Sequence, residues 1–168
     1  MNRINRKSFV VVALFGLMLT AGIVIAAGQQ STPTYSRAYL HSYNLDSTGL
    51  ALEGYCPVTY HTHNVARQGS AEFASTYNGV DYHFVSAAAK RMFESNPEKY
   101  IPAYGGWCAY GMAIQDKFPI DPTNFKIVNG RLMVFLRNQN VDALAKWNQG
   151  DDQAQIVKAD AHWKKVSQ

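Results

Sequence analysis

Hydrophobic residues are unevenly distributed along the chain, and the first long run of them lies near its start. Residues 8–27 contain no charged side chain, and they follow a segment that carries Arg3, Arg6 and Lys7. A basic flank before an apolar run is typical of a secretory signal peptide. An apolar run of about 20 residues can also span a bilayer. Residues 1–27 are therefore predicted to be a signal peptide or an uncleaved signal anchor, and the remainder to be exported.

Two later stretches place hydrophobic residues on either side of an Asn-Gly pair. Asn78-Gly79 lies between runs rich in aromatic residues, and Asn129-Gly130 lies between two apolar runs. Asn and Gly tolerate the positive φ angles of a type I′ turn, so this pair is the strongest short signal of a β-hairpin. We therefore predict two β-hairpins that form an antiparallel sheet.

Short helices are expected around these hairpins. Ser86 can cap a helix that ends before Pro97, and Pro97 suits the first turn of another helix. Two helices are expected near the end of the chain, separated by Gly150. Residues 58–63, with the sequence VTYHTH, predict a short strand because Val, Thr and Tyr suit a pleated surface. The pattern predicts a small α+β domain over residues 39–168, preceded by a polar linker at residues 28–38.

Charge narrows the set of partners. The chain has 16 Lys and Arg and 12 Asp and Glu; the leader holds three of the basic residues and no acid, so the remainder has 13 against 12, or +1. No cluster of basic residues with interleaved aromatics remains, and nucleic acid is not expected as a partner. No phosphate-binding loop or Ser-His-Asp signature is visible either. The sequence therefore favours a protein that is not an enzyme.

The two cysteines, Cys56 and Cys108, carry the most distinctive chemistry. A lone pair of cysteines in an exported protein commonly forms a disulfide, which for so long a loop would stabilise the fold by about 4 kcal/mol. Alternatively, Cys108 follows two glycines and could be a reactive thiol at the start of a helix. Cys108 could instead have a purely structural role, as a small hydrophobic residue buried in the core.

A metal site is the third alternative. Cys56, His61 and His63 form a C-x4-H-x-H pattern, and on a strand the two histidines would share one face. Imidazole and thiolate suit copper or zinc, and Cys108 or Met112 could add soft sulfur for a cuprous ion.

Aromatic residues gather around the second cysteine. Tyr104, Trp107 and Tyr110 flank two glycines, which would let a ligand approach the backbone closely. These three residues are candidates for a ligand-binding groove, although aromatic residues more often belong to a core.

Three motifs in order resemble those of the YHS-domain family: GYCPVTY, then YNGVDYHFVSAAAKRMFESNPEKYIPAYGGWCAYGMA, then DPTNFKIVNGRLMVFL. The likeness spans most of residues 52–163 and is nearest to the exported, stand-alone branch. YHS domains are small α+β modules related to TRASH-type metal-binding modules, so the resemblance implies that fold and a metal-binding role.

The chain departs from the family pattern at two places. Residues 84–89 read FVSAAA where metal-associated members have cysteines, and Cys56 replaces a common Asp, whereas Cys108 matches the family cysteine. The resulting expectation is a non-catalytic copper- or zinc-binding module, in the periplasm or on the outer face of the bacterial cytoplasmic membrane. The alternative is a module that binds an envelope protein or a small ligand, with a Cys56–Cys108 disulfide and no metal. The membrane would be involved only through an uncleaved leader.

Overall fold

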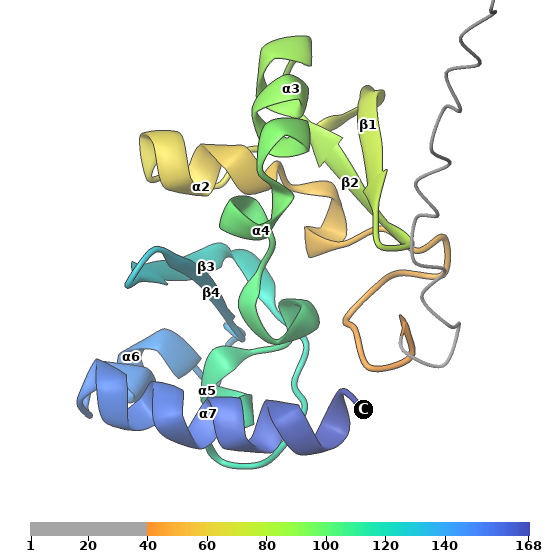
Figure 1. Ribbon diagram of the computed structural model, residues 1–168. Coiled ribbons are helices and arrows are strands. Elements are labelled where there is room, and N and C mark those ends of the chain that lie inside the picture. Colours follow the sequence, from red (N-terminus) through yellow and green to blue (C-terminus); the bar gives the residue numbers. More distant parts are fainter. Residues whose placement is uncertain (1–39) are drawn as a thin grey trace, which may run out of the picture. The chain divides into compact units, whose positions relative to one another are not determined.

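The computed structural model describes residues 40–168 (Figure 1). The predicted leader and linker, residues 1–38, lie outside the described residues. In the described part no helix is long and apolar enough to cross a membrane. The elements, in chain order, are η1 (Leu52–Gly54), α2 (Pro57–His63), β1 (Ser70–Tyr77), β2 (Val80–Phe84), α3 (Ala87–Ser95), α4 (Pro97–Tyr100), η2 (Ala103–Gly106), α5 (Ala109–Ala113), β3 (Asp121–Val128), β4 (Arg131–Phe135), α6 (Ala143–Trp147) and α7 (Asp152–Val166).

Both predicted hairpins are confirmed, and so is the α+β class. β1 pairs with β2 and β3 with β4, each pair antiparallel. The hairpins form two separate two-stranded sheets, so they do not share one sheet. Both turns use the Asn-Gly conformation expected from the sequence, with φ of 52° and 80° at Asn78 and Gly79 and of 50° and 76° at Asn129 and Gly130.

The two hairpins repeat each other residue for residue. In the first, Tyr77 pairs with Val80 and Ser70 with Phe84; in the second, the corresponding pairs are Val128 with Arg131 and Asp121 with Phe135, a constant shift of 51 residues. The register breaks at the same place in both, between Ser70 and Ala74 and between Asp121 and Phe125. The two hairpins therefore have the same internal geometry, with a bulge at equivalent positions.

The repeat extends backward into the segment before each hairpin. Residues 52–54 and 104–106 are both three-residue turns in which every φ is positive. The amide of Cys56 donates to the carbonyl of Arg67, and the amide of Cys108 donates to that of Phe118. Parallel bridges join Leu50 to Asp81 and Pro102 to Leu132. Residues 50–84 and 102–135 thus follow the same path, so the domain is built from two equivalent halves.

Left-handed backbone is costly for residues with a side chain, at about 1–2 kcal/mol each. Leu52 and Glu53 in the first turn and Tyr104 in the second carry this cost. The first residue of each turn is buried, with Leu52 1% and Tyr104 2% exposed. Hydrophobic burial of these anchors offsets the backbone strain and holds both turns in place.

The helices begin where their caps allow. Ser86 caps α3 by accepting from the amide of Ala89, and Pro97 opens α4, as expected. The predicted strand at residues 58–63 is wrong, because these residues lie in α2. Pro57 occupies the first turn of that helix, where its fixed φ and missing N–H are tolerated, and this local signal outweighs the strand preference of Val, Thr and Tyr.

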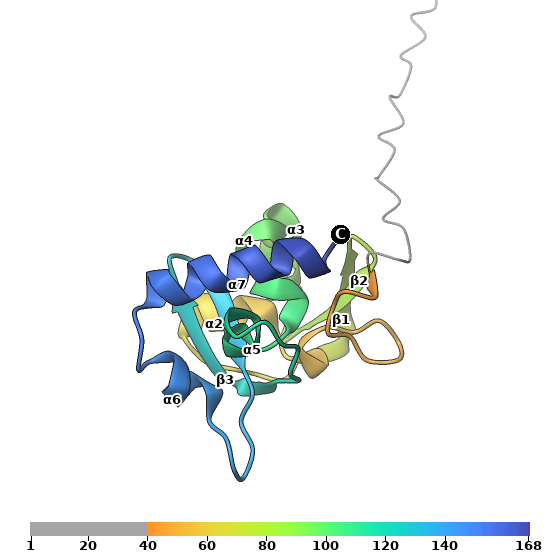
Figure 2. The same ribbon diagram turned by 90° about the horizontal axis from the view of Figure 1, so that it is seen from below.

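The core joins the two halves. The Tyr60 hydroxyl on α2 donates to the carbonyl of Pro122 at 2.9 Å, and its ring packs edge-on against Phe125 on β3. In the second half α7 packs along α5 (Figure 2). Trp147 on α6 is fully buried against Phe135 at the end of β4.

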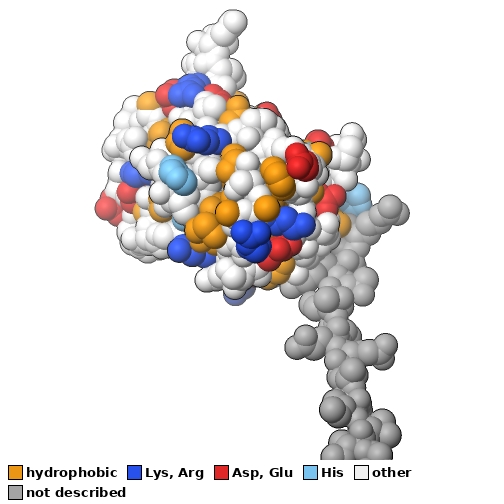
Figure 3. All heavy atoms as spheres, turned by 90° about the horizontal axis from the view of Figure 1, so that it is seen from above, with side chains coloured by type: hydrophobic (Ala, Val, Ile, Leu, Met, Phe, Trp, Pro, Cys, Tyr) orange, Lys and Arg blue, Asp and Glu red, His pale blue; other side chains and the backbone are white. Residues whose placement is uncertain are grey.

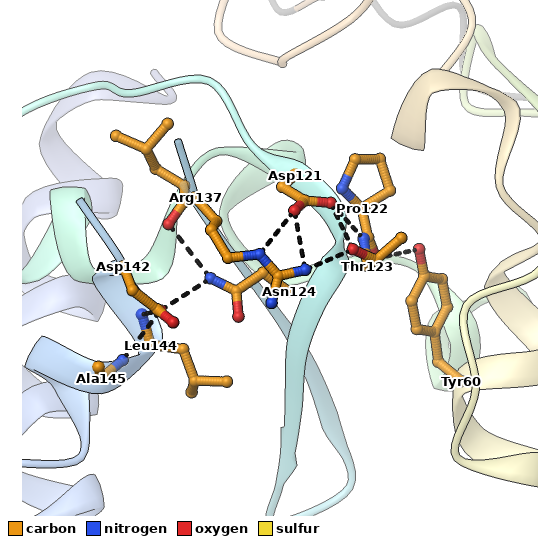
Figure 4. A network of polar contacts seen from close by, with 10 residues as sticks. Tyr60, Asp121, Pro122, Thr123, Asn124, Arg137, Asp142, Leu144 and Ala145 are labelled. Atoms are coloured by element: carbon orange, nitrogen blue, oxygen red, sulfur yellow. Dashed lines mark hydrogen bonds and ion pairs between the residues drawn. The ribbon is translucent and has the colours of Figure 1, made fainter. Parts of the chain in front are cut away.

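A polar network fixes the end of the second hairpin to α6 (Figure 4). The buried Asn124 amide donates to the carbonyl of Leu136 and to the Asp142 carboxylate, which also caps α6. Arg137 pairs with Asp121 at 2.9 Å beside it. Because each donor of the buried amide has an acceptor, burying Asn124 leaves no unpaired N–H there.

Gly106→Ala should lower the free energy of unfolding by about 1–2 kcal/mol, measured by urea denaturation, because alanine would carry the left-handed cost. Gly106 has φ of 84°, yet a Cβ there would meet no atom closer than 3.7 Å, so the effect isolates backbone strain.

Gly150→Ala is the matched control. A Cβ at Gly150 meets only the flexible Gln155 side chain closely, and Gly150 is not in the left-handed region. Equal losses in the two variants would mean that the turn at residues 104–106 is not specially constrained.

Candidate functional site

The two cysteines occupy equivalent positions in the two halves. Cys56 and Cys108 each follow a left-handed turn and an extended aromatic residue, and each is the residue before a helix, α2 or α5. Both are free thiols with 0% exposure. In this structure no disulfide joins them, and both thiols belong to the hydrophobic core.

The environment of Cys108 favours the neutral thiol. Its sulfur accepts hydrogen bonds from the backbone amides of Leu136, Gly111 and Tyr110, which would stabilise a thiolate. Burial is the larger effect and raises the pKa of the Cys108 thiol above its ordinary value. A nucleophilic cysteine requires an accessible thiolate, so this position suits packing better than catalysis.

The helix at α2 changes the geometry of the two histidines. Successive helical residues turn by about 100°, so His61 and His63 point in directions about 200° apart and share no face. The His63 ring is exposed and lies 2.7 Å from the Thr62 hydroxyl. The prediction that they present one face to a metal is therefore wrong.

His61 turns inward instead. Its Nε2 atom is buried without a hydrogen-bond partner, and its ring stands edge-on to Tyr100. Burial, and then the positive charge of Lys99, lower the pKa of His61. Both effects favour the neutral imidazole.

The predicted metal ligands are not brought together as a group. Within residues 40–168 no three His, Cys, Asp or Glu side chains lie close enough to hold a metal ion. Met112, predicted as a supplementary sulfur ligand, is fully buried on α5. Copper or zinc binding by Cys56, Cys108, His61 and His63 stays a prediction.

The three aromatic residues predicted to form one groove separate in the structure. Tyr104 lines a cavity beside α7, whereas Tyr110 lines a different one with Ile114 and Phe118. Trp107 lines neither; its indole N–H donates to the carbonyl of Ser42 at 2.6 Å, and Lys117 lies over its ring. The separation arises because Tyr104 lies in the left-handed turn and Tyr110 lies in α5.

The cavity that contains Tyr104 has a volume of about 240 Å³. Four parts of the chain build it: the segment before η1, residues 98–105, the turn of the second hairpin, and α7. We call it the aromatic groove and define it by Tyr43, Tyr104, Trp163, Lys99, Arg131 and Glu98.

Its aromatic rings brace one another. Trp163 stands edge-on to Tyr43, with centroids 5.8 Å apart, and to Tyr104, with centroids 6.5 Å apart. Gly105 lies under both Trp163 and Tyr43, and a Cβ there would come within 3 Å of each. Glycine is therefore required where the turn meets these rings, and the groove has a rigid aromatic wall.

Arg131 is held in a fixed position at this wall. Its guanidinium makes two hydrogen bonds to Asp160, at 2.8 and 3.1 Å, and lies 5.3 Å from the centre of the Tyr104 ring. The Tyr104 hydroxyl donates to the same carboxylate at 3.0 Å. Burial raises the pKa of Tyr104 and hydrogen bonding to Asp160 raises that of Arg131, so phenol and guanidinium both stay protonated.

The other cavities include two apolar ones at equivalent places in the two halves. One lies between α2 and α3 and is lined by Val58, Val85 and Met92; the other lies between α5 and α6 and is lined by Tyr110 and Leu136. Viewed from the side of α3, hydrophobic side chains reach the surface among Lys, Arg and His side chains (Figure 3). Since both halves have such an apolar cavity, we attribute the two cavities to the packing of hairpin and helices that the halves share.

Sequence reasoning missed five residues of the aromatic groove: Tyr43, Glu98, Lys99, Arg131 and Trp163. They come from four separate segments of the chain. The Gly-Arg pair in the second hairpin turn was the available signal, because an Asn-Gly turn places the next side chain at the tip of a hairpin.

No protein-family model matches this chain, and the searches of curated proteins and of solved structures each returned no match. The resemblance to YHS domains stays a prediction from the sequence. We therefore infer function from the geometry of the described residues.

The buried thiols lead to a prediction about reactivity. An aromatic disulfide reagent should titrate two thiols per chain in unreduced protein after denaturation, and should react slowly before it, because both sulfurs are in the core. Cys56→Ala should reduce the count to one. A count of zero without reductant would show that the cysteines form a disulfide.

The lowered pKa of His61 leads to a prediction about stability. The unfolded chain has the higher pKa, about 6.5, so it binds more protons below that pH and stability falls as pH decreases toward the folded pKa. When the pH is lowered from about 7.5 to about 5.5, the free energy of unfolding, measured by urea denaturation, should decrease less for His61→Gln than for the unsubstituted protein. His63→Gln, at an exposed site on the same helix, is the control and should lose as much as the unsubstituted protein.

Proposed function

We propose that this chain is a non-catalytic binding domain that takes a small organic ligand in the aromatic groove. The observation that carries this proposal is the combination of a braced aromatic wall with an arginine fixed by Asp160 and Tyr104. Binding sites of this kind join apolar contact area to a few well-placed polar groups. Following the predicted leader, we place the domain outside the bacterial cytoplasmic membrane.

The chemistry of the groove supports binding rather than catalysis. The side chains that line it include no Cys, His or Ser, and its one carboxylate, that of Glu98, accepts a hydrogen bond from the Tyr77 hydroxyl at 2.6 Å. Tyr104 and Arg131 hold their protons, because the pKa of each is raised. These groups can orient a ligand, but they lack the general base and nucleophile that covalent catalysis requires.

Metal binding receives less support from the geometry. The two cysteines are buried in separate positions of the repeat, and the two histidines diverge on α2. A copper or zinc site built from them would need the core to rearrange, whereas the aromatic groove needs no change.

The proposal predicts that indole, as a neutral aromatic probe, binds in the groove with a Kd on the order of 1 mM, about 4 kcal/mol. In nuclear magnetic resonance titrations, the backbone amides of Gly105 and Arg131 and the indole N–H of Trp163 should shift. Ile101→Trp should abolish these shifts, because Ile101 lines the groove and the larger side chain would fill it.

Ile114→Trp is the matched control. Ile114 is 51% exposed and lines the separate cavity beside Tyr110, so this substitution should leave indole binding unchanged. Loss of binding in Ile114→Trp but not in Ile101→Trp would contradict the proposal.

A further inference from the structure

The two halves of the domain provide an internal comparison for the groove. A counterpart of the aromatic groove lies beside the first hairpin turn, where Gly79 takes the place of Gly130. Tyr43 lies between the two cavities and lines both. Any side chain that the shared turn and hairpin require should therefore recur in both halves, and any that does not recur serves another purpose.

Tyr104 and the two cations of the groove do not recur in the counterpart cavity. By the register of the repeat, Leu52 stands in the place of Tyr104, and Val80 in the place of Arg131. Leu52 and Val80 are both buried, and the counterpart cavity is lined by Asp46, Ser47 and Thr48 rather than by Lys or Arg. The same backbone path is thus built without the phenol and without either cation.

The groove is lined by two cations, and one of them, Arg131, is paired with Asp160. Lys99 and Arg131 line it, and Glu98 is the one acid among the lining residues. Lys99 is exposed and makes no ion pair with any residue from 40 to 168. Asp160 accepts from two of the five guanidinium N–H groups of Arg131 and the Tyr104 hydroxyl oxygen is a further partner, so two N–H groups are left for a ligand.

From these observations we infer that the ligand is a small aromatic acid, a ring that carries a carboxylate. This deepens the proposed function and depends on it. The ring packs against Trp163 and Tyr43, while the carboxylate accepts hydrogen bonds from Arg131 and Lys99. The volume of about 240 Å³ is on the order of eight water molecules, which suits one such ring and a short acidic arm.

The test compares three probes that share one ring: indole, indole-3-acetate and tryptamine. Titrations followed by the Trp163 indole N–H should show indole-3-acetate binding about tenfold more tightly than tryptamine, because only the anion can accept the charge-assisted hydrogen bonds. Lys99→Gln and Arg131→Gln should each reduce this ratio severalfold. We compare the ratio of the two affinities because a substitution that only disturbed the structure would weaken the binding of both probes alike.

Lys117→Gln is the matched control. Lys99 lies over the ring of Tyr100, and Lys117 likewise lies over the ring of Trp107 but does not line the groove. The substitution removes one positive charge and should leave the ratio unchanged. If all three probes bind in the groove equally well, the inference fails and the proposed function stands. If none of them shifts the groove residues, both fail.

Discussion

Two left-handed turns, at residues 52–54 and 104–106, direct the chain into each half of this domain. Each turn forces three consecutive residues into a backbone conformation that L-amino acids avoid, and each is anchored by a buried side chain, Leu52 or Tyr104. In each half, the residue two positions after the turn is a buried cysteine. The amide of Cys56 donates to the carbonyl of Arg67, and the amide of Cys108 donates to that of Phe118. The burial of these anchors offsets the backbone strain, so the turns depend on the core around them.

The second turn also creates the binding surface. Tyr104 and Gly105 lie in it, so the same backbone strain that starts the second half places a phenol and a gap for Trp163 at the groove. α7, which has no counterpart of its length in the first half, then supplies Trp163 and Asp160. The groove therefore lies where the second half has a long helix that the first half lacks.

Local signals predicted much of the fold. The Asn-Gly pairs identified both hairpins, and Ser86 and Pro97 marked helix starts, since in each case one residue type suits a particular backbone geometry. The prediction of a strand at residues 58–63 was wrong, because the preference of these side chains for strands was given more weight than Pro57, which suits the first turn of a helix. The internal repeat was not visible in the sequence, because equivalent positions retain little beyond the Gly-aromatic-Cys run and the Asn-Gly pair.

The site was harder to predict than the fold. Tyr104 was identified as a groove residue, but its predicted companions Trp107 and Tyr110 lie elsewhere, and the actual companions come from distant segments. Such convergence is a product of tertiary packing, which no local spacing encodes. The metal prediction was based on the chemistry of the cysteines and histidines, whereas the burial of both cysteines is a product of tertiary packing.

The proposed ligand site can be tested with a crystal structure of the protein grown with indole-3-acetate. We expect the ring beside Trp163 and Tyr43, with the carboxylate within hydrogen-bonding distance of Arg131 or Lys99. An empty aromatic groove at saturating ligand, or a ring bound instead beside Tyr110 and Ile114, would contradict this expectation.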